Sequence, residues 1–184
     1  TNNFLERTAF KDGKTAFNPD GVLTGMAHLY VAGTHVYATS PRGLVVIDID
    51  DPTDPKLVGV FGSGDLKNPA CVQVQFRYAF VTDESGLKPF DITDPKNPRL
   101  TASLDLPGEK HRLYVARTYA YVACGSAGLA IVDVTAPERP SVYSQFTADG
   151  ALKDTRDVKV GMTNASMYAY VADGKAGFKV LQLM

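Results

Sequence analysis

The chain lacks the features that mark several common classes of protein. No apolar run approaches the roughly 18 residues needed to span a bilayer, so we expect no membrane span. Lysine and arginine are scattered and the formal net charge is −1, so the clustered positive surface that binds a phosphate backbone is missing. Nucleic acid is therefore not an expected partner, and no acidic tail or basic amphipathic stretch points to a membrane surface.

Catalytic and metal-binding motifs are also missing. The sequence has no Cys-x-x-Cys, no His-Glu-x-x-His, no Gly-x-Ser-x-Gly, no glycine-rich phosphate loop and no c-type haem attachment motif. It has two cysteines, Cys71 and Cys124, which do not make a disulfide framework. They fall at different positions of the repeat described below, so we expect buried free thiols. On these grounds we predict no metal, no cofactor and no catalytic residue.

What the sequence does contain is an internal repeat. In each of four segments, a short Tyr/Val-rich run is followed by a second run of the Tyr-Ala-Tyr-Val type and then by a glycine that opens a third run. The marker glycines are spaced 43, 42 and 49 residues apart; they are Gly43, Gly86, Gly128 and Gly177. A proline pair follows three of the repeats, namely Pro52 and Pro55, Pro95 and Pro98, and Pro137 and Pro140. The two markers recur in phase, which indicates true repetition.

Each repeat has the composition of four short strands, rich in Val, Ile, Tyr and Phe and broken by Gly, Pro, Asp and Asn. No segment shows a sustained helical period. Four-stranded units of about 40–50 residues are typical of β-propellers, and a single unit cannot bury both of its faces, so neighbours must stack. We therefore predict an all-β fold, a β-propeller of four-stranded antiparallel blades. The repeats span approximately residues 27–61, 70–106, 111–146 and 157–184 of a single domain or propeller fragment.

Two of the glycine-led runs carry a family resemblance. The sequences Gly-Leu-Val-Val-Ile-Asp at 43–48 and Gly-Leu-Ala-Ile-Val-Asp at 128–133 resemble the LVIVD-repeat family of bacterial propeller proteins, over nearly the whole chain. The resemblance implies an exported protein, at the cell surface, outside the cell or in the periplasm, and brings no shared catalytic motif. The fourth repeat departs from the pattern, because Gln182 stands where the other repeats have aspartate.

The two ends of the chain are out of phase with the repeat. Residues 1–10 resemble a fourth strand, whereas the chain stops directly after a third strand. In one arrangement the N-terminal strand completes the last blade and closes a four-blade ring without exposed edges. In the other, the chain is part of a larger propeller that another chain or segment completes. The abrupt ends, with Thr1 rather than methionine first, favour the second arrangement.

One set of polar residues recurs at the start of the innermost strand, which usually faces the central channel of a propeller. The set consists of His28, Cys71, Arg112 and Asp157. These side chains could converge on a ligand site at the channel rim, and His, Cys and Asp are competent metal ligands. The alternative is a row of solvated rim residues, which the lack of a second ligand pair favours.

Other recurring residues have structural interpretations. Asp48, Asp91 and Asp133 precede the turn that ends the third strand, and their repetition favours turn stabilisation over a ring of cation-binding carboxylates. The many tyrosines of the first two strands are expected to pack between blades rather than to form a recognition surface. The loop 161–167 is a candidate contact point; it contains Asn164-Ala165-Ser166, which matches a glycosylation sequon.

Three functions are compatible with this pattern. The first is a non-enzymatic interaction or scaffold module, since a propeller presents broad loop surfaces and function lives in sites grafted on the fold; its partner would be a protein. The second is a hydrolase or lyase, metal-assisted or not, that uses His28, Arg112 and Asp157 at the channel mouth. The third is a structural subunit of a surface filament or an electron-transfer assembly, because an unpaired strand edge invites β-augmentation.

Overall fold

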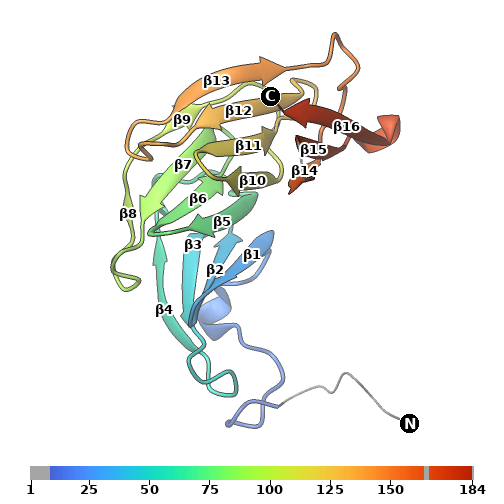
Figure 1. Ribbon diagram of the computed structural model, residues 1–184. Coiled ribbons are helices and arrows are strands. Elements are labelled where there is room, and N and C mark those ends of the chain that lie inside the picture. The colour runs from blue at the N-terminus through green and yellow to red at the C-terminus, as the bar shows by residue number, and fades with distance from the viewer. Residues whose placement is uncertain (1–8, 164–165, 184) are drawn as a thin grey trace, which may run out of the picture.

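The computed structural model describes residues 9–163 and 166–183, which form four antiparallel β-sheets with two short 3₁₀ helices (Figure 1). Sheet 1 contains β1 (His28–Ala32), β2 (His35–Ser40), β3 (Gly43–Asp48) and β4 (Lys56–Phe61). Sheet 2 contains β5 (Cys71–Gln75), β6 (Tyr78–Thr82), β7 (Gly86–Asp91), β8 (Arg99–Leu100) and β9 (Leu104–Asp105). Sheet 3 contains β10 (Leu113–Ala116), β11 (Tyr119–Ala123), β12 (Leu129–Asp133) and β13 (Ser141–Phe146). Sheet 4 contains β14 (Asp157–Met162), β15 (Met167–Ala172) and β16 (Phe178–Leu183). The helices are η1 (Pro19–Gly21) and η2 (Gly174–Ala176).

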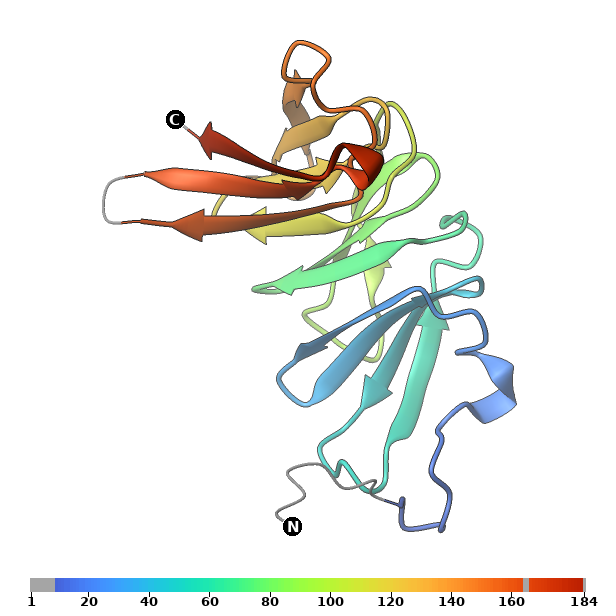
Figure 2. The same ribbon diagram turned by 90° about the vertical axis from the view of Figure 1, so that its right-hand side faces the viewer.

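Each sheet is a meander whose strands pair in chain order, except that β9 of sheet 2 pairs with β7 beside β8. The innermost strands contact one another in succession, β1 with β5, β5 with β10 and β10 with β14. Figure 2 shows the sheets fanned one after another, with sheet 1 and sheet 4 at opposite ends of the series. This radial stacking confirms the predicted β-propeller fold class. No helix among the described residues is both long enough and apolar enough to cross a membrane.

The predicted strand at residues 1–10 falls largely outside the described residues, which begin at residue 9. The two residues that are described, 9 and 10, are not in a strand. The Phe10 N–H donates to the Lys14 carbonyl at 2.7 Å, and the Lys11 N–H donates to the Thr53 carbonyl at 2.8 Å. The first bond closes a turn within the segment, and the second anchors the segment to the turn between β3 and β4, at the sheet 1 end of the molecule.

The core lies between the sheets, and its three junctions share one design. At each junction a face rich in Tyr, Phe and Leu (the aromatic face) packs on a face of mainly Val and Ala (the aliphatic face) of the next sheet. Between sheets 1 and 2 the buried members include Tyr37, Leu44 and Val46 against Val72, Val74, Ala79 and Val81. Between sheets 2 and 3 they include Tyr78, Phe80 and Leu87 against Leu113, Val115, Ala120 and Val122. Between sheets 3 and 4 they include Tyr121 and Leu129 against Val158, Ala169 and Val171. The prediction that tyrosines pack between blades is thereby confirmed for sheets 1 to 3, whereas Tyr168 and Tyr170 of sheet 4 pack in none of these junctions.

The loop that leads into each innermost strand adds one buried aliphatic side chain to the core. These residues lie five to seven positions before the strand start and are Val22, Leu66, Leu106 and Leu152. Three of them sit at the junctions between sheets, whereas Val22 packs on the outer side of sheet 1. Each of these side chains (the plug residues) removes apolar surface from water where two sheets diverge. Sequence analysis did not identify the plug residues.

Sheet 2 keeps this geometry despite two unusual residues in β7. Pro89 has no N–H to donate to a neighbouring strand. The outermost strand of the sheet is accordingly split into β8 and β9. Between these two strands the Pro89 carbonyl accepts the N–H of Thr101 at 2.9 Å. Lys88 stands where the other repeats are mostly apolar. Its Nζ lies 3.3 Å from the Asp83 carboxylate, and both side chains are buried.

The recurring aspartates have the structural role that was expected. Asp48 Oδ1 accepts the N–H of Asp50 at 2.9 Å, and Asp133 Oδ1 accepts the N–H of Thr135 at 2.8 Å. Asp91 does the same for Thr93 at 2.8 Å. Each carboxylate therefore closes the turn that follows its own strand, and the three do not converge on a cation site.

Candidate functional site

The structure brings together three of the four predicted rim residues. The Nδ1 atom of His28 lies 3.6 Å from the Sγ atom of Cys71 and accepts the N–H of Val72 at 3.4 Å. The Arg112 guanidinium reaches across both neighbours, with Nη1 3.3 Å from the Ala27 carbonyl and 3.5 Å from the Ala70 carbonyl. Arg112 thereby ties sheet 3 to the chain just before sheets 1 and 2.

The fourth predicted residue, Asp157, forms a pair of its own. Its Oδ1 atom lies 3.0 Å from Lys159 Nζ and accepts the N–H of Val158 at 2.8 Å. Its charge still reaches His28, where it works to raise the pKa of the imidazole. The rim is therefore a set of neighbouring polar groups rather than one four-residue cluster.

The ionisation of the rim argues against a nucleophile there. Burial, followed by the positive charge of Arg112, lowers the pKa of His28 and so favours the neutral imidazole. Burial raises the pKa of the Cys71 thiol, whereas a nucleophilic cysteine needs a depressed pKa and a charged partner. Across residues 9–163 and 166–183, no three His, Cys, Asp or Glu side chains are placed to hold a metal ion.

The second cysteine is equally unreactive in character. Cys71 and Cys124 are both buried and both free, as expected. Burial raises the pKa of Cys124 to about 11, and its Sγ lies 3.4 Å from the Val122 carbonyl within the same sheet. Arg112 and Lys159 place positive charge near Cys71, but neither thiol has the accessibility or the lowered pKa of a reactive cysteine.

A different kind of surface lies at the sheet 4 end. The aromatic face of sheet 4 has no sheet of the described chain upon it. Phe178 is 68% exposed and Val180 is 51% exposed, and the Phe178 ring stacks on Tyr170 at a centroid distance of 6.0 Å. At the equivalent position of sheet 3, Leu129 is fully buried by sheet 4. Exposed apolar surface of this kind is often an interaction site.

A groove of about 210 Å³ runs beside the outer edge of the same sheet. In the part of the chain that the structure describes, sheet 4 has three strands and β16 is outermost. The groove lies between β16 and sheet 3 and is lined by Tyr119, Tyr121, Leu129, Ile131, Tyr143, Ser144, Phe146, Leu181, Gln182 and Leu183. Tyr143 of β13 is 68% exposed there and meets Tyr119 edge-on at 5.3 Å between ring centroids.

The marker glycines show what the groove is shaped to hold. At Gly43, Gly86 and Gly128 a Cβ atom would strike the carbonyl of the fourth strand, at Phe61, Leu104 and Phe146 respectively. At Gly177 a Cβ atom would meet nothing within 4 Å. Sheet 4 therefore has the glycine that admits a fourth strand, in a place where no described residue supplies one.

Sequence analysis found the rim by repeat alignment but missed this groove. The groove is lined by tyrosines of sheet 3 that a fourth strand of sheet 4 would cover. No local sequence motif indicates such an arrangement. A usable signal was Gly177, since the other marker glycines lie against a fourth strand. The loop 161–167 lines a neighbouring hollow through Met162, Thr163, Ser166 and Met167, while Asn164 and Ala165 of the sequon lie outside the described residues.

The fold and its repeated meander define a class, the β-propeller repeat proteins. Within that class the chain belongs to the LVIVD-repeat family, whose model matches residues 26–62, 107–147 and 154–181. The unmatched stretch holds sheet 2, where Lys88 and Pro89 replace the usual apolar pair. A comparison with curated proteins found no significant match.

Solved structures share the fold at low sequence identity. The computationally designed Ika4 protein matches with a TM-score of 0.65 at 12% identity, over 90% of this chain and 95% of that one. A protein from Desulfotomaculum acetoxidans matches with a TM-score of 0.56 at 12% identity, over 85% of this chain and 55% of that one. PorZ of Porphyromonas gingivalis matches with a TM-score of 0.53 at 15% identity, over 94% of this chain but only 23% of its own length. The chain thus spans about half, or less, of these two natural proteins.

Proposed function

We propose that the chain is a non-enzymatic protein-interaction module of an exported or cell-surface bacterial protein. The observation that carries the proposal is the groove beside β16, where an apolar floor, an outermost strand and the open space at Gly177 coincide. Main-chain hydrogen bonds to a strand edge supply affinity, and pockets for alternate side chains supply specificity. The partner is therefore a protein that offers an extended segment.

The other three sheets define the segment that would fit. Their fourth strands run antiparallel to the third and place a bulky apolar residue opposite the residue after the marker glycine, as Phe61 lies opposite Leu44 and Phe146 opposite Leu129. A partner strand on β16 would thus set an aromatic or leucyl side chain opposite Phe178. It would also direct an aliphatic side chain toward Tyr143. The corresponding contact between sheets 2 and 1 is that of Leu100 in β8, which lies in the same cluster as Val58 and Phe61 of β4.

The channel rim supports a scaffold rather than an enzyme. The His28 imidazole accepts a backbone N–H, and the Arg112 guanidinium donates to two backbone carbonyls. Both side chains therefore use their hydrogen bonds to join neighbouring sheets. The cellular location rests on the family resemblance and on the shared fold with PorZ, which is described as a bacterial surface component of the type-IX secretion system.

A peptide that copies residues 139–147, the fourth strand of sheet 3, tests the binding mode. We expect saturable binding to the whole protein in fluorescence anisotropy, weakened at least about tenfold, or 1.4 kcal/mol, by Tyr143→Glu in the groove. A scrambled peptide and the Phe76→Glu variant, whose side chain is 91% exposed in another turn, serve as controls. Absence of saturable binding, or equal binding by the groove variant, would contradict strand docking.

Fractionation of the source cells tests the location separately. Antibody detection should find the protein in the envelope or outside the cell, and protease added to intact cells or spheroplasts should degrade it. Recovery only in the cytoplasmic fraction, protected from protease, would contradict the exported location while leaving the binding mode untouched.

A further inference from the structure

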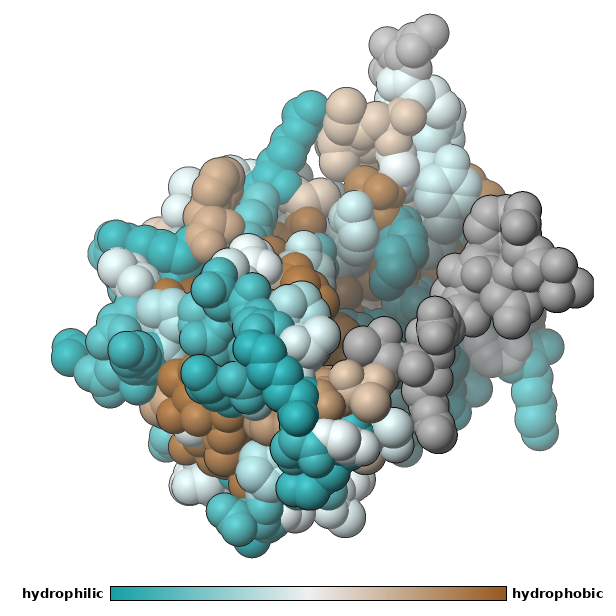
Figure 3. Space-filling view, turned by 90° about the horizontal axis from the view of Figure 1, so that it is seen from below, coloured by the Kyte–Doolittle hydropathy of each residue, from teal (hydrophilic) through white to brown (hydrophobic). Residues whose placement is uncertain are grey.

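The series of sheets ends in two apolar faces of different kinds, each exposed at least in part. On sheet 1 the segment around η1 covers the centre of the aliphatic face, where Val22 packs with Ala38 and Val45. The inner strand of that face is open, with Leu29 48% and Val31 53% exposed. On sheet 4 the aromatic face is open at Phe178 and Val180. The two faces lie at opposite ends of the molecule (Figure 2), and the sheet 1 end, viewed in Figure 3, shows apolar patches between hydrophilic side chains.

Sheet 1 is already built as the receiving half of a junction. Its strand register places Leu29 and Val31 beside Ala38 and Val36 on one face, just as the register of sheet 2 places Val72 and Val74 beside Val81 and Ala79. In sheet 2 these residues receive the aromatic face of sheet 1. The plug residue is also in place, because Val22 is only 4% exposed and packs on the outer side of sheet 1 as Leu66 packs between sheets 1 and 2.

Sheet 4 supplies the donating half in the same way. Its register places Tyr170 beside Val180 and Tyr168 beside Gln182 on the face turned away from sheet 3. The corresponding pair in sheet 3 is Tyr121 with Ile131, which packs on sheet 4. Every interior junction thus joins an aromatic face to the aliphatic face of the next sheet, and the two ends of this one chain carry one face of each kind.

We propose that a second copy of this chain docks its sheet 1 on sheet 4, aliphatic face on aromatic face, and so extends the propeller across two molecules. The contact uses two different patches, so it is heterologous and closes into a ring only if the rotation between copies permits. It goes beyond the proposed function, because it uses the broad face of sheet 4 rather than the groove at the edge of β16. It also removes the largest exposed aromatic side chain of sheet 4, Phe178, from water.

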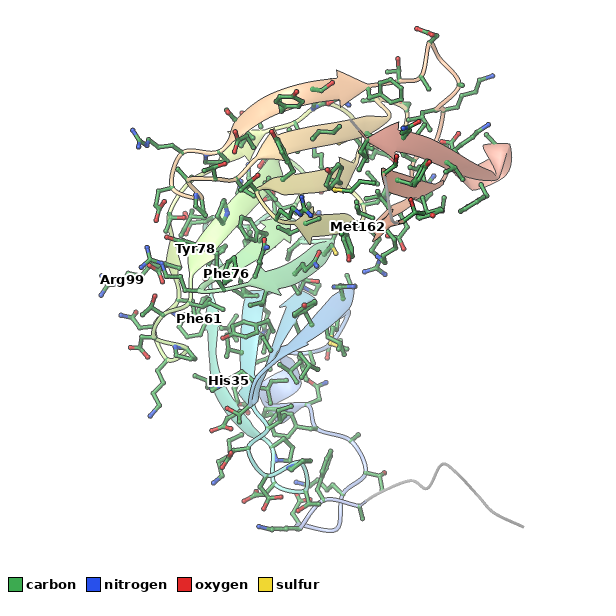
Figure 4. All side chains as sticks on the ribbon, viewed as in Figure 1. His35, Phe61, Phe76, Tyr78, Arg99 and Met162 are labelled. Carbon is green, nitrogen blue, oxygen red and sulfur yellow. The ribbon has the colours of Figure 1, made fainter. Side chains whose placement is uncertain are left out.

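The oligomeric state of the full 184-residue chain tests the proposal. Size-exclusion chromatography with light scattering should give a mass of at least twice the 19.8 kDa of one chain. Phe178→Glu and Val31→Glu should each weaken association at least about tenfold, because each buries a carboxylate against an apolar face. Phe76→Glu changes a still more exposed apolar side chain at the tip of the β5–β6 turn (Figure 4) and should leave the mass unchanged.

A mixing experiment separates the two faces. A Val31→Glu chain keeps an intact sheet 4 face and a Phe178→Lys chain keeps an intact sheet 1 face, so a mixture of the two should associate while each alone stays monomeric. Circular dichroism establishes that every variant is folded, and Leu29→Glu and Val180→Lys replace any that is not. A monomeric wild-type chain at the highest soluble concentration, or association that neither face variant changes, would overturn the proposal. Tyr143→Glu should leave the mass unchanged, so failure of strand docking in the groove is seen independently.

Discussion

The junction between sheets 3 and 4 and the open face of sheet 4 are built from equivalent positions of one repeat, yet they have opposite exposure. Leu129 is completely buried in the junction, whereas its counterpart Phe178 is 68% exposed. The same side-chain pattern stabilises the fold where another sheet covers it and is exposed apolar surface where none does. The interior of the array therefore supplies stability, and its end is where we propose that interaction takes place.

The largest expected effect is in the interior, at Asp83. Its carboxylate accepts backbone N–H groups of Lys67 at 3.0 Å and Gly86 at 3.1 Å and pairs with Lys88. Asp83→Asn leaves the Lys88 charge buried without its partner, so we expect a loss of about 3–5 kcal/mol in the free energy of unfolding. Urea denaturation measures it, and a loss below 1 kcal/mol in that assay would show that the pair is not buried as described.

A matched pair of substitutions tests the comparison itself. Leu129→Ala should cost about 2–5 kcal/mol because it opens a cavity in the core. Phe178→Ala should change the unfolding free energy of the monomer by less than about 0.5 kcal/mol, as surface substitutions do. The measurement is thermal or urea unfolding at a concentration where the chain is monomeric. Equal costs at the two positions would mean that the face of sheet 4 is covered within one chain.

A smaller effect should appear as the pH is lowered. Burial works to raise the pKa of Asp83, but hydrogen bonds from Lys67, Ser85 and Gly86 outweigh it, and the net pKa lies below the usual value. A lowered folded-state pKa gives stability that is complete above the unfolded pKa of about 3.9 and is lost as the pH falls through the folded pKa. Unfolding free energies measured between pH 6 and acid conditions should fall less steeply for Asp83→Asn than for the wild type. Parallel curves would argue against this role of the carboxylate.

The smallest effect is expected at the rim, from Arg112→Ala. The guanidinium is partly solvated and its contacts with the carbonyls of Ala27 and Ala70 are long, so we expect a loss of about 1 kcal/mol. Arg112→Lys should recover only part of it, because one ammonium cannot match the planar fork of a guanidinium. A loss well above 3 kcal/mol in the same urea assay would show that the rim is a principal source of stability.

The sequence allowed most of the fold to be predicted, because strands and turns follow local chemistry. The period of the marker glycines and the aspartate turns at Asp48, Asp91 and Asp133 were enough to define the sheets. What escaped prediction depends on partners distant in sequence. The pairing of Lys88 with Asp83, the plug residues and the groove at Tyr143 arise only when sheets are stacked in space.

The candidate site shows the same division. Repeat alignment correctly placed His28, Cys71 and Arg112 next to one another, since equivalent positions of a propeller meet at its axis. It could not reveal that backbone groups already engage His28 and Arg112, nor that Asp157 is paired with Lys159. The candidate residues from the sequence were polar, whereas the exposed surfaces that we propose for binding are apolar.

Hydrogen–deuterium exchange of the outer strands shows whether the edge of β16 is open. The account expects backbone amides of β12, which is paired on both sides, to exchange far more slowly than those of β16, which is outermost in sheet 4 among the described residues. Addition of the 139–147 peptide should slow exchange in β16 and leave β12 unchanged. Protection of β16 equal to that of β12 in the free protein would contradict the account, because a strand of the chain itself would then already occupy the groove.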